Sequence, residues 1–279
     1  MKQSKKSIIF SYAILIFATL IVLLPFFWML VSSFKSQREL FAYPPTFFPS
    51  VWKWENYKQV LSAGSISFFQ MFLNSMKVTL PVVVLNITFS SLAAYAFARI
   101  NFPFKKFIFM MFISSMMIPA AVVMIPRFML FTKLKMIDSA FYFPLILPSA
   151  FGTAFSIFLL RQFFMTIPVD LEEAAVIDGC GKFRIWATII VPLSKPIIAT
   201  LSVFLFQGTY NDFMGPLIYI NSDKLFTIQL GLASFRNSFA TRYDLIMAGS
   251  MLALIPVLII YIVCQKYIVK GIVMSGLKG

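Results

Sequence analysis

Six long, almost uncharged stretches constrain what this chain can fold into. A helix that crosses the hydrocarbon core of a bilayer, roughly 30 Å thick, needs about 20 mostly apolar residues. One such stretch, Pro196–Ser222, contains a single charge, Asp212. The five others have none: Ser7–Phe34, Val78–Ala98, Phe107–Pro126, Ala140–Leu160 and Leu245–Gln265. Because backbone amides cannot stay unpaired in lipid, each stretch is expected to be helical. The sequence thus predicts an all-α polytopic membrane protein with six transmembrane helices.

Composition and charge agree with a membrane protein. Apolar residues make up 60% of the chain and charged residues 12%, whereas soluble domains are roughly 45–50% apolar and about 25% charged. The net charge is +14, but the basic residues are spread between the apolar stretches. Cations in that arrangement flank spans and face anionic headgroups. Membrane lipid is therefore the expected partner, and nucleic acid is excluded.

The sequence lacks several patterns on which catalytic and metal sites depend. There is no histidine, which removes Ser-His and Cys-His pairs and HExxH metal sites. The two cysteines, Cys180 and Cys264, make no disulfide framework and are expected at the cytoplasmic face. The pair Gly181-Lys182 is followed by Phe183 and does not fit the phosphate-binding loop GxxxxGK[ST]. We expect no enzyme activity, no metal and no cofactor bound by this chain.

The charged ends and loops suggest a topology. The short basic N-terminus favours the cytoplasm, and six spans return the C-terminus to the same side. The first apolar run is expected to remain as an anchor. An aromatic external loop, about Lys35–Lys77, is expected to pack at the outer interface, and Arg161–Lys195 is the longest cytoplasmic segment. Prolines inside the spans predict kinks: Pro25, Pro81, Pro119, Pro144, Pro148, Pro216 and Pro256.

The segment Thr166–Pro196 carries the most informative local pattern. Asp170 followed by Glu173 predicts a capping box, then a helix over Leu171–Asp178, with Gly179 as the left-handed residue that ends it. A second helix over Lys182–Val191 follows, with one apolar face formed by Phe183, Trp186 and Ile190. Two interpretations fit this pair of short helices. One is an amphipathic elbow at the membrane interface, and the other is a docking element for a cytosolic partner.

Four residues favour the docking interpretation. Ala174 and Ala175 would let another protein approach the helix backbone closely, and Glu172 and Glu173 would offer charged contacts. A lipid-bound elbow would be expected to carry bulky apolar residues at the alanine positions.

The same segment resembles the EAA loop of permeases in binding-protein-dependent ABC importers, whose pattern is EAA-x3-G-x9-I-x-L-P. The matching positions are Glu173, Ala174, Ala175, Gly179, Ile189 and Pro192, with Val191 in place of Leu. Further stretches are similar to the shorter permease of maltose-type sugar importers. They are Phe158–Phe164, Ile167-Pro168, Tyr210–Phe213, Gln265–Gly271 and Leu277–Gly279. Two departures from the family pattern occur here. Tyr210 stands where Trp is usual, and the tail has Ser275 and Gly276 where Gly and Ala are usual. The resemblance covers about Asn74–Gly279.

The resemblance implies a type I ABC importer transmembrane fold and a function, import of sugars or oligosaccharides. It divides the chain into residues 1–72 (first span and external loop), 73–266 (transmembrane core, with the EAA coupling loop 161–195) and 267–279 (cytoplasmic tail). The implied partners are a dimer of ABC ATPase subunits that binds ATP and Mg²⁺, a second homologous permease and an extracytoplasmic solute-binding protein. The implied location is the bacterial cytoplasmic membrane. The residues implied to contact the ATPase are Leu171, Glu172, Glu173, Ala174, Ala175, Asp178 and Gly179, with Lys270, Gly271, Leu277, Lys278 and Gly279 in the tail.

Four polar residues are candidates for the translocation pathway: Asn74, Gln207, Asn211 and Asp212. An intramembrane charge is a functional hypothesis by default, and Asp212 falls about 24 Å along its span, in the outer third of the bilayer. The alternative is a structural cap at Gly215-Pro216. An ion-coupled secondary transporter is the competing function, but one peripheral Asp and no His argue against proton coupling. Neither clustered catalytic groups nor a channel filter motif is visible.

Overall fold

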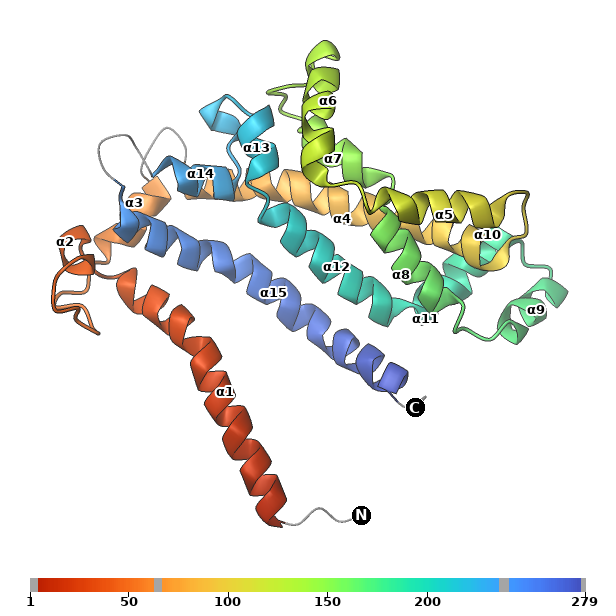
Figure 1. The fold of residues 1–279 in the computed structure, drawn as a ribbon, viewed down its shortest axis with the longest axis horizontal. Coiled ribbons are helices and arrows are strands. Elements are labelled where there is room, and N and C mark those ends of the chain that lie inside the picture. The colour runs from red at the N-terminus through yellow and green to blue at the C-terminus, as the bar shows by residue number, and fades with distance from the viewer. Residues whose placement is uncertain (1–4, 63–66, 236–240, 277–279) are drawn as a thin grey trace. The chain divides into compact units, whose positions relative to one another are not determined.

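The computed structural model describes residues 5–62, 67–235 and 241–276, and most of them are helical (Figure 1). In chain order the first elements are α1 (Lys5–Ser32), α2 (Gln37–Leu40), α3 (Glu55–Ser62), α4 (Phe68–Arg99), α5 (Lys105–Ser115), α6 (Ala120–Lys133), α7 (Phe143–Ala150) and α8 (Ala154–Phe164). They are followed by α9 (Asp170–Ile177), α10 (Lys182–Ile185), the π-helix η1 (Trp186–Ile190), α11 (Val191–Leu193), α12 (Lys195–Tyr210), α13 (Met214–Tyr219), the 3-10 helix η2 (Asp223–Leu225), α14 (Ile228–Ser234) and α15 (Tyr243–Gly276).

Between four and six segments are long and apolar enough to cross a membrane. Four qualify by themselves: Ile8–Ser32, Phe68–Arg99, Phe143–Phe164 and Tyr243–Tyr267. Two helix pairs qualify if each bent pair is one span. They are Lys105–Ser115 with Ala120–Lys133, bent by 94°, and Lys182–Leu193 with Lys195–Tyr210, bent by 79°. The described residues thus agree with the predicted all-α polytopic fold, with an upper count of six.

Three of the predicted spans are interrupted by short non-helical segments, at residues 116–119, 151–153 and 211–213, where only kinks were predicted. The stretch Phe107–Pro126 forms α5 and α6, and Pro119 stands at the break in an extended conformation, with ψ 136°. A proline cannot donate the next helical hydrogen bond and disfavours helix in the preceding residue. The stretch Pro196–Ser222 is broken after Tyr210, and α13 starts only at Met214. By contrast, the prolines at 25, 81, 148 and 256 lie inside helices.

The contacts divide the chain into two compact units, residues 1–70 with 231–255, and residues 71–230 with 256–279. In the first unit the loop after α1 packs on Phe34, whose ring lies 4.7 to 5.1 Å from those of Trp52, Trp54 and Tyr57. The buried amide of Asn56 fixes this loop, because its Nδ2 donates to the carbonyls of residues 33 and 35 at 2.9 Å each.

Two apolar clusters lie among the described residues of the second unit. The larger surrounds the C-terminal end of α4 and comprises Ala94, Tyr95, Leu160, Phe164, Ile167, Ala175, Ile185, Ile190 and Leu201. It therefore joins α4, α8, α9, α10, η1 and α12 around the predicted coupling loop. The smaller comprises Val78, Tyr142, Ile220 and Leu230.

Candidate functional site

The candidate site is the short helix α9, which follows α8 and is connected onward to α10 (Figure 1). Its start differs from the predicted capping box. Val169, not Asp170, precedes the helix, and its carbonyl accepts the amides of Glu172 and Glu173 at 2.8 and 3.1 Å. No side-chain cap is formed. Asp170 is already helical, so its carboxylate lies in the first turn, where a negative charge interacts favourably with the helix dipole.

The end of α9 is as predicted. Gly179 has a φ of 78°, in the left-handed region that glycine adopts without strain. Its amide donates to the carbonyl of Val176, and the amide of Cys180 donates to the carbonyl of Ala175, both at 2.9 Å. These two bonds form a Schellman motif, which turns the chain sharply from α9 into α10.

An ion pair anchors the inner side of α9 to the end of α4. Glu172 is 8% exposed, and its Oε1 accepts a hydrogen bond from Arg99 Nε at 2.5 Å. The hydroxyl of Tyr95, one turn earlier on α4, donates to the other carboxylate oxygen at 3.2 Å. Arg99 also donates through Nη2 to the carbonyls of Phe164, at 2.9 Å, and of Ile167. The guanidinium therefore ties together α4, the end of α8 and α9.

This geometry corrects the role expected for two of the site residues. Glu172 was expected to offer a charge to a partner, but it is paired within the chain, and Ala175 is packed in the larger apolar cluster at 7% exposure. The outward residues of α9 and the turn after it are Asp170, Leu171, Glu173, Ala174, Val176, Ile177, Asp178 and Gly179. Ile177 is 87% exposed. The exposed face therefore combines apolar side chains with carboxylates that have no ion pair in the described part of the chain.

The second predicted helix, Lys182–Val191, is formed, and two residues of its predicted apolar face, Trp186 and Ile190, pack in or against the larger apolar cluster, whereas the prediction for Phe183 is wrong. Ile185 and Ile190 are buried, whereas Phe183 is 69% exposed and its ring lies 5.1 Å from that of Trp186, with the two planes tilted by 39°. The reason is the π-helical turn at residues 186–190. A π turn is wider than an α turn, so residues five apart, such as Ile185 and Ile190, point to the same side.

The four pathway candidates are not gathered into one site in the described structure. Asn74 is buried and donates to the carbonyls of residues 224 and 226 at 2.9 and 3.1 Å. Gln207 is exposed, and Asn211 accepts from the Gln229 amide at 3.0 Å. Asp212 Oδ1 accepts the amide of residue 215 at 3.1 Å. The structural alternative for Asp212, a cap where α13 begins, is therefore the arrangement observed.

Sequence reasoning missed the two residues that hold α9 in place, Tyr95 and Arg99. Arg99 ends a span and precedes a basic loop, so it was indistinguishable from the cations that usually flank spans. For the predicted tail contacts, residues 277–279 lie outside the described residues, and residues 270 and 271 lie in α15 with side chains that are likewise not described.

Comparison with known proteins identifies the family. The model of the family described as "Binding-protein-dependent transport system inner membrane component" matches residues 86–273, from the middle of α4 to α15. That range covers about two thirds of the chain and includes α9 and its anchor. The chain belongs to this family. This membership confirms the predicted resemblance and does not support the alternative of a secondary transporter.

Individual relatives are similar in sequence to this permease along almost its whole length. It is 35% identical over 263 residues to the arabinooligosaccharides transport system permease protein AraQ of Bacillus subtilis, covering 94% of this chain and 92% of AraQ. It is 34% identical over 273 residues to the sn-glycerol-3-phosphate transport system permease protein UgpE of Pectobacterium atrosepticum, covering 96% of each chain. Its fold matches a bacterial ABC transporter chain involved in the import of the acidic polysaccharide alginate. That match has a TM-score of 0.80 and 24% identity, and covers 96% of this chain and 99% of the other.

Proposed function

We propose that this permease forms half of a translocation pathway for sugars or oligosaccharides, driven by a cytosolic ATPase that docks on the exposed face of α9. The solute class is supported by the relatives, which are named for arabinooligosaccharides and for sn-glycerol-3-phosphate. These solutes share a polar, hydroxyl-rich character. The ATP and Mg²⁺ belong to the partner subunit, since the sequence has no phosphate-binding loop.

The observation that carries the proposal is the two-sided character of α9. Its inner side is locked to α4 through Glu172 and Arg99, while its outer side exposes apolar surface at Leu171 and Ile177. An exposed apolar side chain beside carboxylates that have no ion pair among the described residues suits a protein partner better than water. A partner that moves α9 would move α4 with it, because the ion pair and the apolar cluster connect them rigidly. Rigid-body displacement of packed helices is a common way to couple two sites.

The remaining components follow from the family and belong to the same proposal. A second, homologous permease completes the pathway, and an extracytoplasmic binding protein delivers the solute. The protein lies in the bacterial cytoplasmic membrane with both termini in the cytoplasm, which puts α9 on the side where ATP is available. Alternating access then results from the different docking of the ATPase in its ATP-bound and ATP-free states.

Site-directed crosslinking of the assembled complex tests the docking. Cys180 and Cys264 are first replaced by alanine, and Ala174→Cys is introduced on the exposed face of α9. We expect a crosslink to the ATPase subunit whose yield changes with ATP, and solute uptake that falls when the crosslink forms. The matched control is Thr132→Cys, an exposed position on α6. Equal crosslinking at both positions, or none at α9, contradicts the proposal.

A further inference from the structure

A basic pocket lies at the start of α5, between α5, the end of α4 and α8. It has a volume of about 410 Å³ and is lined by Phe97, Asn101, Lys105, Lys106, Phe109, Met110 and Arg161. Three of these side chains are cationic, and none of the described residues that line the pocket is acidic. Like charges brought together without a counter-charge repel one another, so the pocket favours an anion.

Arg161 is held in position to bind that anion. Its guanidinium lies over the Phe109 ring at 4.4 Å, and its Nε donates to the carbonyl of Phe97 at 3.2 Å. The terminal nitrogens make no hydrogen bond within the described residues. A planar guanidinium with free terminal N–H groups is well suited to a phosphate.

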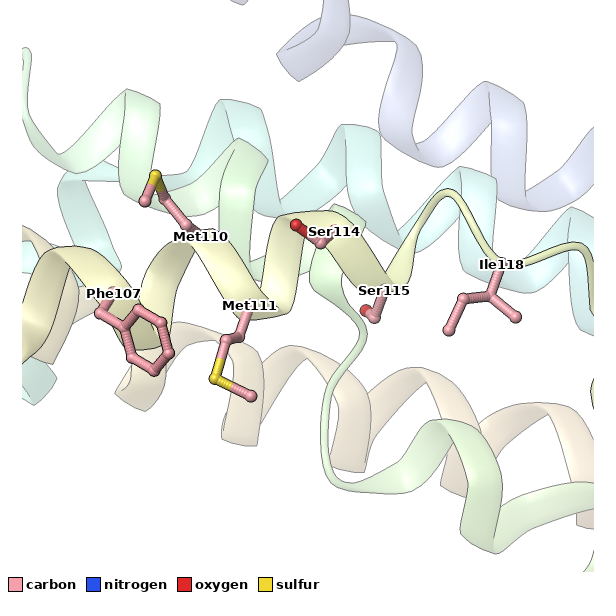
Figure 2. A pocket seen from close by; sticks show the side chains of 6 residues that line it. All are labelled: Phe107, Met110, Met111, Ser114, Ser115 and Ile118. Atoms are coloured by element: carbon pink, nitrogen blue, oxygen red, sulfur yellow. The ribbon is translucent and has the colours of Figure 1, made fainter.

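An apolar groove continues from this pocket along α5. It is also about 410 Å³ in volume, is lined by Phe107, Met110, Met111, Ser114, Ser115 and Ile118, and shares Met110 with the basic pocket. Figure 2 shows these side chains following α5 from its first turn into the loop that leads to α6. The 11 residues of α5 extend about 16 Å, which is close to half of the roughly 30 Å hydrocarbon core. The groove therefore has the length of one leaflet.

We propose that the pocket and the groove together bind an anionic phospholipid, with the phosphate among Lys105, Lys106 and Arg161 and an acyl chain along α5. A cationic pocket followed by an apolar groove matches the two parts of such a molecule, and basic pockets between transmembrane helices are a known way to hold headgroups. The pocket residue Asn101 is two positions from Arg99, so the lipid would lie beside the segment that holds α9. The proposal goes beyond the transport function and does not depend on it.

Lipid retention by the purified complex tests the proposal without any transport assay. The probe is phosphatidylglycerol in a mixture with phosphatidylcholine, and the bound lipid is quantified by native mass spectrometry. We expect preferential retention of phosphatidylglycerol. The double variant Lys105→Gln/Lys106→Gln should weaken it by roughly 30-fold, since two surface charges are removed. Lys105→Arg/Lys106→Arg should retain it, and Lys58→Gln, an exposed cation on α3, is the control. Equal retention by the Gln double variant and the control overturns the proposal.

Two further arms separate the lipid from other ligands of the pocket. Met111→Trp, which fills the groove, should reduce retention, while excess inorganic phosphate should not displace the lipid because it lacks the acyl chain. If phosphate removed as much lipid as the double variant loses, the pocket would be a simple anion site, and this result would overturn the lipid assignment. A photoreactive amino acid at position 106 should label phosphatidylglycerol. Labelling of another protein subunit in its place would show that a protein covers the pocket, and would also overturn the assignment.

Discussion

The substitution Glu172→Gln tests how firmly α9 is attached to the membrane helices. Glu172 and Arg99 have side chains 11% and 12% exposed, so their ion pair is shielded from water. A glutamine keeps the size of the side chain but removes its charge, and leaves the guanidinium without a counter-charge. Hydrogen bonds to charged groups contribute roughly 1.5–3 kcal/mol. A loss of about 2 kcal/mol raises the population of detached α9 by roughly 30-fold.

Hydrogen exchange of the assembled complex measures this population directly. The amides of α9 that are hydrogen-bonded within the helix, such as that of Asp178, should exchange roughly 30-fold faster in Glu172→Gln. ATP hydrolysis should continue while the solute transported per ATP falls, because the ATPase still docks but no longer moves α4. Glu55→Gln on α3 is the control, since Glu55 is exposed, lies outside the proposed docking face and has no ion pair in the described structure. In this control the exchange of α9 should match that of the wild type. Unchanged exchange in Glu172→Gln would refute the reasoning.

Three further predictions concern other parts of the chain. Gly179→Ala should destabilise the end of α9 by about 1–2 kcal/mol, because the φ of 78° at this position is strained for alanine. The amides of α9 should then exchange hydrogen faster. In the control Gly181→Ala, at a position with an ordinary φ of −72°, the exchange rate of α9 should not change. Burial raises the pKa of Glu39, which lies in α2, but hydrogen bonds from Ser50 and Thr46 and the nearby charge of Lys35 together outweigh burial, so the pKa is lowered overall. The stabilisation is therefore present above the unfolded-state pKa and lost as the pH falls through the lower folded-state value, so the Ser50 amide should lose protection in acid, and Glu39→Gln should abolish that pH dependence. Ile190→Ala removes a fully buried side chain and should cost roughly 2–5 kcal/mol, visible as a lower melting temperature of the complex.

Local features of the sequence determined much of this protein. The apolar stretches determined the helices, since lipid leaves no alternative to internal hydrogen bonding. Gly179 determined the end of α9, because a left-handed residue after a helix is a local requirement that glycine meets. The residues of the EAA pattern gave the family, because they occur at fixed spacing within one segment.

Only the tertiary structure decided which way the residues of α9 face and what holds them. Glu172 pairs with Arg99 across 73 positions in the chain, and no helical period distinguishes that inward carboxylate from its exposed neighbour Glu173. The basic pocket likewise gathers cations from α5 and α8. Pairings of this kind depend on how separate helices pack, and a periodicity measured within one segment carries no information about them.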